Sequence, residues 1–188
     1  MKMRPSRVFR WIVRMFLFLL TLSMTVVSIL GCLSAVMILG NMNENIKIPA
    51  GPPSANFDIT NPSSMNITIP FNITNAGYFD LTSLIIDVKI SMTFGNASTP
   101  TNETTNAVVF DKAQIFPNII RGQTYSGVFF GNSSDFIEAN FPNATTEIDW
   151  FRTPALEFSG NFTLSAYYSL DLIAFTFGIN NVTLGTIP

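Results

Sequence analysis

Acidic side chains are the main candidates for chemistry in this chain of 188 residues, because it has no histidine and a single cysteine. Glu147 and Asp149 alternate on one strand-like face. Asp135 and Glu138 lie three residues apart. Paired carboxylates can bind Ca²⁺ through oxygen ligands or act as the acid and base of a glycosidase. Solvated polar faces explain both pairs more simply, so we expect neither a metal site nor a catalytic site here.

The residue types that are missing exclude several classes of enzyme. Without histidine there is no Ser-His-Asp or Cys-His nucleophile, no imidazole zinc site and no cupredoxin-type copper site. One cysteine excludes an internal disulfide bond. Neither a glycine-rich phosphate loop nor a Gly-x-Ser-x-Gly elbow occurs. We therefore predict a protein that is not an enzyme and that binds no cofactor.

Asn-x-Ser/Thr triplets are the most frequent motif in the chain, and they mark acceptor sites for asparagine-linked glycans. Seven fall on polar strand faces or in loops, where a glycan has room, whereas the last is close to apolar residues. In a host that glycosylates asparagine, archaeal or eukaryotic, we predict that several of them are modified. The eight candidates are Asn66, Asn72, Asn96, Asn102, Asn132, Asn143, Asn161 and Asn181.

A long apolar segment near the N-terminus determines where the rest of the chain lies relative to a membrane. Residues 15–40 contain no charge, and as a helix they would measure about 39 Å, against about 30 Å for the hydrocarbon core of a bilayer. Five cations and no acid lie in residues 1–14, with Trp11 among them. Cations remain on the cytoplasmic side and aromatic rings favour the headgroups. The sequence predicts a basic cytoplasmic tail, a transmembrane helix over 15–40 and an extracytoplasmic body.

Processing of this segment gives two alternatives. A signal peptide could be cleaved near Ala35 or Gly40, although the apolar stretch is longer than the usual 7–15 residues. Residues 29–32 resemble a bacterial lipobox, which would make Cys32 a lipidated N-terminus, but the apolar run continues where a polar tether is usual.

Small residues form a stripe along one side of the predicted helix. Such stripes let transmembrane helices approach each other closely, so we consider this one a candidate face for a protein partner or a second copy. Its members are Ser28, Gly31, Cys32 and Ala35.

Beyond the helix the apolar period changes from that of a helix to that of strands. Residues 41–56 are rich in Asn, Pro and Gly, and we expect a linker there with neither helix nor strand. Residues 66–74, 86–94 and 161–172 alternate between apolar and polar positions, as in strands with one buried face. Pro70 suggests an edge strand or a bulge. About seven strands with short connections predict an antiparallel two-sheet sandwich over 57–188, with one short helix near 134–140.

Three stretches carry a resemblance to a known family. In residues 66–94 an apolar strand is followed by a turn at Asn75 and by a second strand that opens with Ile85-Ile86-Asp87-Val88. Later comes Ser165-Ala166-Tyr167-Tyr168-Ser169-Leu170. These stretches resemble the LEA type 2 (WHy, water stress and hypersensitive response) superfamily, in its archaeal membrane-anchored form, although Asn75-Ala76 replaces the family's usual Asn-Pro. The resemblance implies an immunoglobulin-like or fibronectin-III-like sandwich without catalytic residues, and some members are proposed to bind lipid.

Charge and topology together narrow the function. The body after residue 40 carries five cations and all twelve acids, a net charge of −7, which argues against nucleic-acid binding. Our leading hypothesis is a single-pass surface protein whose partners are the bilayer and a protein in or at the membrane. That protein partner could be a second copy of the chain. The alternatives are a module that binds lipid between its sheets and a pilin-like or S-layer anchor subunit.

Overall fold

The computed structural model describes residues 5–58, 61–97, 104–137, 140–142, 146–149, 156–168 and 171–187. Within these residues, one long helix, α1 (Pro5–Gly40), is followed by the short helix α2 (Met42–Asn45), by eight strands and by two 3-10 turns. The strands are β1 (Ile46–Lys47), β2 (Ser54–Asn56), β3 (Asn66–Thr74), β4 (Thr82–Gly95), β5 (Thr104–Phe116), β6 (Thr124–Gly131), β7 (Leu156–Tyr168) and β8 (Ile173–Ile187). The 3-10 turns are η1 (Pro62–Ser64) and η2 (Ser133–Asp135).

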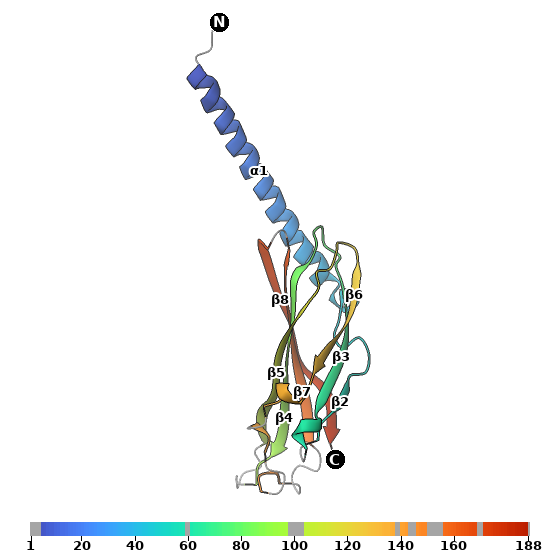
Figure 1. The fold of residues 1–188 in the computed structure, drawn as a ribbon. Helices are drawn as coiled ribbons and strands as arrows, with labels where there is room; N and C mark the ends of the chain where they lie inside the picture. Colours follow the sequence, from blue (N-terminus) through green and yellow to red (C-terminus); the bar gives the residue numbers. More distant parts are fainter. Residues whose placement is uncertain are drawn as a thin grey trace.

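The strands form two antiparallel sheets. In the smaller sheet, β3 pairs with β6 on one side and with β1 and β2 on the other. The larger sheet has the order β5-β4-β7-β8. Figure 1 shows the sheets packed as an elongated sandwich, with α1 extending from one end. The predicted fold class, one N-terminal helix followed by a mainly β antiparallel sandwich, is confirmed.

Alternation of side chains builds the core between the sheets. In β3, every second residue from Ile67 to Ile73 is fully buried, and the residues between them lie on the outer face. The same alternation runs along β4 and β7, where large aromatic residues such as Phe158 and Phe162 fill the interior. Burial of these apolar faces is the main stabilising contribution to the fold.

The segment 41–56 differs from the linker that its composition suggests. It contributes α2, β1 and β2, and Ile46 and Ile48 are buried in the core. β1 pairs with residues 72 and 73 of β3, and β2 pairs with residues 66–68. Pro70 lies in the gap between these two pairings, where its missing N–H is not needed. Its carbonyl still accepts a hydrogen bond from the Ala50 N–H at 2.7 Å.

Three further details differ from the sequence prediction. The apolar pattern predicts short strands at 107–110 and 113–120, but the structure has one continuous strand, β5, in their place, with a register shift opposite Ile90. Apolar residues 175, 177 and 179 follow in the opposite phase to those of 162–172, which predicts a bend or bulge near 173–174; the structure has a hairpin turn that ends there instead, in which Asp171 has a positive φ of 64°. The short helix expected at 134–140 begins as the 3-10 turn η2, and residues 138 and 139 lie outside the described residues.

Candidate functional site at the junction of helix and sandwich

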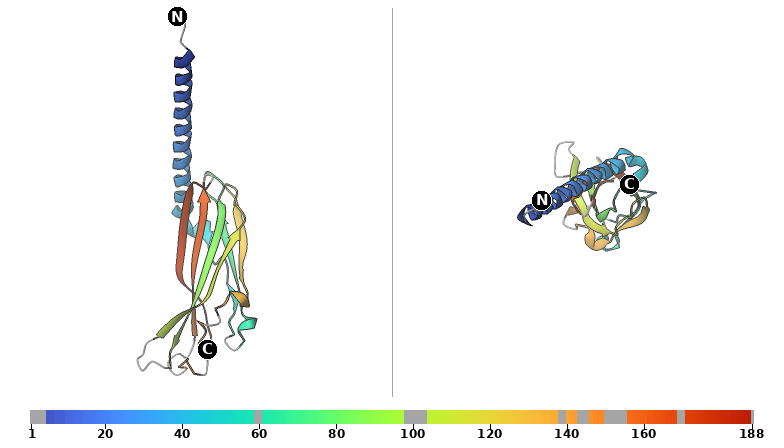
Figure 2. Two further views of the ribbon diagram at one scale, coloured as in Figure 1. Left: turned by 60° about the vertical axis from the view of Figure 1, so that its left-hand side comes forward. Right: turned by 90° about the horizontal axis from the view of Figure 1, so that it is seen from above.

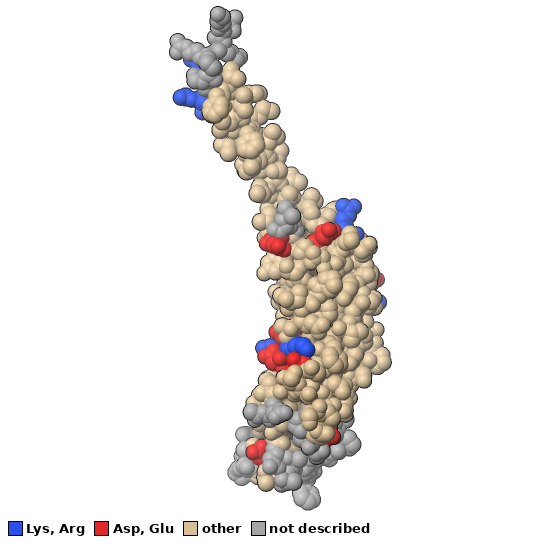
Figure 3. Space-filling view, in the orientation of Figure 1, with Lys and Arg blue, Asp and Glu red and all other residues tan. Residues whose placement is uncertain are grey.

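Most of α1 is uncovered in the isolated chain. From Arg7 to Ile29 its residues are exposed, apart from a half-buried Val27, and large apolar side chains predominate. Figure 3 shows this surface free of charged side chains between the cations near the N-terminus and the sandwich, on the face displayed. Within the described residues, one helix is long and apolar enough to cross a membrane.

The last three turns of α1 behave differently, because they pack against the sandwich. Gly31, Ser34 and Ile38 are buried, and their spacing of three and four residues places them on one face of the helix. Ile38 belongs to the hydrophobic core itself, and Ala35 and Leu39 pack against that core. The helix is therefore part of the folded domain. Figure 2 shows its C-terminal part lying along one end of the sandwich.

Ser34 makes the closest polar contact between the helix and the strands. Its Oγ accepts a hydrogen bond from the Tyr78 N–H at 2.9 Å and donates one to the Leu30 carbonyl at 2.8 Å. Opposite it stands Gly77, where a Cβ would lie 2.8 Å from the Ser34 Cβ and 3.0 Å from the Tyr168 ring. Only glycine lets the loop between β3 and β4 approach the helix this closely.

The C-terminal end of α1 is capped by its own chain. The Asn45 side chain, which is buried, donates from Nδ2 to the Met37 and Ile38 carbonyls, both at 3.2 Å. These carbonyls are among the four that a helix leaves without intrahelical partners. Asn45 thus pairs two of these four carbonyls where the chain turns from α1 into the smaller sheet.

A buried polar network holds the loop that receives the helix. Asn75 is fully buried, and its Nδ2 donates to the carbonyls of Phe79 at 2.9 Å and Ile119 at 2.8 Å. Its Oδ1 accepts hydrogen bonds from the Gly77 N–H at 3.0 Å and the Tyr168 hydroxyl at 2.8 Å. Burial raises the pKa of the Tyr168 phenol, so this group stays protonated and remains a donor.

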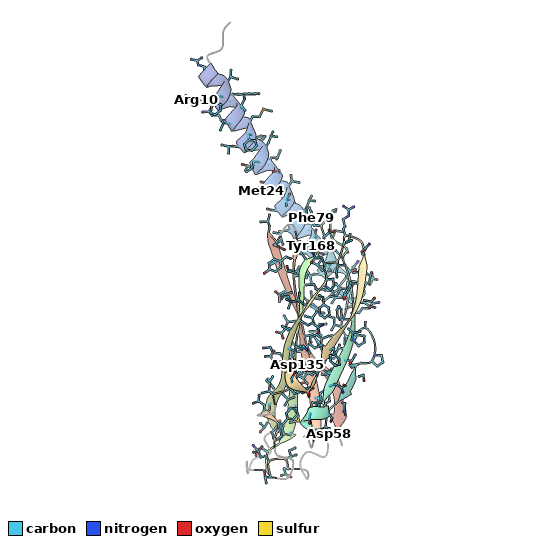
Figure 4. The ribbon with its side chains drawn as sticks, viewed as in Figure 1. Arg10, Met24, Asp58, Phe79, Asp135 and Tyr168 are labelled. Atoms are coloured by element: carbon cyan, nitrogen blue, oxygen red, sulfur yellow. The ribbon has the colours of Figure 1, made fainter. Side chains whose placement is uncertain are left out.

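The three connections at this end of the sandwich are tied to one another. Leu81 and Ile119 exchange two backbone hydrogen bonds of 2.9 Å, joining the β3–β4 loop to the β5–β6 loop. The Thr82 hydroxyl donates to Asp171 at 2.7 Å and so reaches the β7–β8 turn. Figure 4 shows Tyr168 and Phe79 at this end, beside the last turns of α1. Together these contacts fix the direction in which the helix leaves the domain.

The predicted small-residue stripe does not form one free face. Gly31 is buried and Ala35 half-buried against the chain's own sandwich, whereas Ser28 and Cys32 are exposed. Sequence reasoning found the stripe but missed what it packs against. It also missed Ser34, Gly77 and Tyr168 as junction residues, because nothing in their spacing shows that they meet.

The described glycan candidates all lie outside the buried core. Asn66 and Asn72 lie on the outer face of β3, and Asn96 follows β4. The Asn132 Oδ1 accepts a hydrogen bond from the Ser134 hydroxyl at 2.7 Å, so this bond uses the oxygen and not the Nδ2 that would carry a glycan.

Two of these candidates contact each other across β7 and β8. Asn161 accepts the Asn181 N–H on its Oδ1 at 2.9 Å. Asn181 has a positive φ of 58° and lies where the register of these strands shifts, a conformation that asparagine tolerates. Asn102 and Asn143 lie outside the described residues.

The carboxylates have structural partners. Asp135 accepts hydrogen bonds from Lys112 Nζ at 2.7 Å and from the Asn132 N–H at 2.9 Å. Burial alone would raise the pKa of Asp135, but these bonds and the Lys112 charge outweigh it and lower the pKa. Glu147 is exposed and Asp149 half-buried, and Glu138 lies outside the described residues. No group of three or more potential metal ligands occurs among the residues that the structure describes.

A second charged group, on the outer face of the larger sheet, was not singled out from the sequence. Lys89 on β4 forms an ion pair of 3.1 Å with Asp111 on β5. Burial and the Asp111 charge raise the pKa of the neighbouring Asp87, against the lowering effect of Lys89.

Comparisons with known proteins do not identify a family or a function for the chain. No family model matches the chain, and no curated protein does. The solved structures that are similar to it include the sporulation control protein Spo0M of Bacillus subtilis, at 11% identity and a TM-score of 0.37, over 73% of this chain and 48% of that one. The chain thus spans about half the length of Spo0M.

A second similar structure is the ApaA protein of Bordetella pertussis, at 12% identity and a TM-score of 0.29, over 74% of this chain and 88% of that one. A third is a β-glucosidase from intestinal bacteria, at 15% identity and a TM-score of 0.29, over 72% of this chain and 16% of that one. Membership in the LEA type 2 superfamily stays a prediction.

Proposed function

We propose that the chain is a non-enzymatic, single-pass membrane protein that holds a β-sandwich at the outer surface of the cell membrane. In this proposal α1 spans the bilayer, the basic tail is cytoplasmic, and the glycosylated sandwich serves in interaction or envelope structure. The observation that carries it is the exposed apolar surface of α1 from Arg7 to Ile29, which is continuous with a well-packed domain. Exposure of such a long apolar surface to water is unfavourable, so we expect the hydrocarbon core of a bilayer to cover it.

The charges support this direction of insertion. The tail holds cations and no acid, whereas the rest of the chain after α1 is acidic. Positive residues retained on the cytoplasmic side set the orientation of a single helix. The sandwich would then be exported, which is also the side on which asparagine-linked glycans are found.

Single-cysteine accessibility tests the topology directly. Cys32 lies in α1 and is the only cysteine, so Cys32→Ala gives a cysteine-free background. In that background, Ala113→Cys places a thiol on an exposed position of β5, and Ser6→Cys places one in the tail. Intact cells are treated with a membrane-impermeant maleimide. We expect labelling at position 113 in intact cells, and at position 6 only after permeabilisation.

Each alternative pattern contradicts part of the proposal. Labelling at position 6 alone in intact cells would show that the orientation is the opposite of the one proposed. Recovery of the chain in the soluble cell fraction, with both positions labelled only after lysis, would refute the membrane anchor.

The exposed apolar surface of α1 also fits the pilin-like alternative, because the helices of several copies could cover each other. It predicts a shortened N-terminus and assemblies in which α1 crosslinks to α1. An intact Met1 or Lys2 N-terminus, determined by mass spectrometry, together with a monomer after crosslinking, would exclude it. The lipid-ligand alternative has no comparable support among the described residues.

A further inference from the structure

The end of the sandwich beside α1 exposes apolar side chains at three separate connections. We call this surface the helix end; it consists of residues 75–81, 117–123 and 171–172. Tyr78 is 44% exposed, Ile120 55% and Leu172 53%. Each lies in a different connection, and the hydrogen bonds described above join the three connections into one surface. Figure 1 shows all three on the side of the sandwich from which α1 emerges.

The length of the free helix brings this surface to the bilayer. Met15–Leu30, the apolar stretch between Arg14 and the first buried turn, has 16 residues and spans about 24 Å. The hydrocarbon core is about 30 Å thick. With Arg14 at the cytoplasmic edge of this core, Ser34 reaches the outer edge after 20 residues, or about 30 Å.

A deeper placement of the tail leaves the result nearly unchanged. With Trp11 at the cytoplasmic edge, the outer edge falls at Gly31, and Ser34 lies about 4.5 Å beyond it. Headgroups occupy about 5 to 8 Å on each side. Since the Tyr78 N–H is bonded to Ser34, Tyr78 lies within the headgroup layer or at its boundary in both placements. A tilt of α1 draws the junction deeper.

The chemistry of the helix end fits this depth. A tyrosine ring with a polar hydroxyl is favoured at the interface, and isolated apolar residues there lose contact with water. Arg121 is exposed in the same connection as Ile120 and can pair with lipid phosphate. Asp80 and Asp171 at this end are exposed, and each accepts a hydrogen bond from the protein, Asp80 from the Arg121 N–H at 2.9 Å and Asp171 from the Thr82 hydroxyl at 2.7 Å.

We propose that the helix end is a membrane-contact surface, whose Tyr78, Ile120 and Leu172 side chains lie in the headgroup layer of the outer leaflet. The partner is the lipid surface itself. The sandwich therefore stands on the bilayer in a defined orientation, with its opposite end directed away from the membrane. This inference rests on the proposed membrane anchor, because it takes the position of the surface from the placement of α1.

Depth-dependent fluorescence quenching tests the proposal on the full chain in phosphatidylcholine vesicles. In the Cys32→Ala background, Gln123→Cys carries a fluorophore at the helix end, and Thr146→Cys carries it at the opposite end. The strands separate the two probes by about 45 Å. A lipid with a nitroxide on its headgroup should reduce emission at least about twofold at position 123, and by less than about a tenth at position 146.

Substitutions then separate apolar contact from mere proximity. Tyr78→Ser, Ile120→Ser and Leu172→Ser combined should reduce the quenching at position 123 to less than half. Val128→Ser with Phe130→Ser is the matched control, since these residues are 49% and 48% exposed on β6, away from the helix end. The control should leave the quenching unchanged.

The possible failures are distinguishable. If the chain floats with the vesicles but position 123 is not quenched, or the serine variants quench as strongly as the wild-type chain, the contact surface is refuted and the anchor stands. If the chain does not float with the vesicles, the anchor itself is refuted, and the contact surface with it.

Discussion

Replacement of Asn75 by alanine should destabilise the sandwich more than any exposed substitution. Asn75 is fully buried and makes four hydrogen bonds through its side chain. In Asn75→Ala the Ile119 carbonyl keeps its bond from the Leu81 N–H. The Phe79 carbonyl, the Gly77 N–H and the Tyr168 hydroxyl each lose the partner that Asn75 supplies.

The expected size of the effect follows from these three groups. A buried polar group left unpaired costs about 1–3 kcal/mol, so the loss in the free energy of unfolding should be about 3–5 kcal/mol, since some relaxation offsets the sum. Tyr168→Phe removes one bond and leaves Asn75 Oδ1 bonded to the Gly77 N–H, so it should cost only about 1 kcal/mol. The larger loss is a substantial part of a typical total of about 5–15 kcal/mol.

Urea unfolding of the full chain in detergent micelles measures this, with near-ultraviolet circular dichroism reporting the aromatic core. We expect the midpoint of Asn75→Ala to fall by about 2 M relative to wild type. Asn118→Ala is the matched control, because its exposed amide makes only a 3.4 Å contact with the Ser83 N–H. If Asn75→Ala shifts the midpoint no more than Asn118→Ala does, the network does not hold the junction.

Three further predictions concern single positions. Gly77→Ala should loosen α1 from the sandwich, since its Cβ would lie 2.8 Å from that of Ser34; faster hydrogen exchange in the last turns of α1 would show this, and unchanged exchange would contradict it. Asp135→Asn should lower stability by about 1–2 kcal/mol at pH 7 through loss of the Lys112 pair. Because folding lowers the pKa of Asp135, its contribution is present above the ordinary carboxyl pKa and disappears as the pH falls through the folded value. The difference between the urea midpoints of wild type and variant should therefore disappear in acid. Expressed in a host that glycosylates asparagine, Asn72→Gln should increase gel mobility by the mass of one glycan, and identical mobility would mean that the site is unoccupied.

The strands could be predicted because their faces differ in polarity. β3 alternates perfectly between buried and partly exposed positions, so a period of two is visible in the letters themselves. The short strands β1 and β2 could not be found this way. They have two and three residues, too few to show a period, and they form because β3 offers an unpaired edge on either side of Pro70.

The junction was beyond sequence reasoning for a different reason. Ser34, Asn75 and Tyr168 are far apart in the chain, and each is of an ordinary type for its predicted element. Their common role exists only when α1, the β3–β4 loop and β7 are packed together. The sequence did predict that Gly31 and Ala35 face a close neighbour, but it could not show that the neighbour is the chain's own sandwich.

The contact of α1 with β7 and β8 joins the first element of the chain to the last two. During synthesis α1 leaves the ribosome long before Leu156, so its contacts with β7 and β8 form only when nearly the whole chain has been made. A chain that terminates early would keep α1 but leave the face that contacts β7 and β8 uncovered. A fragment that begins after Asn56 would lack α1, α2, β1 and β2, and with them the core residues Ile38, Ile46 and Ile48.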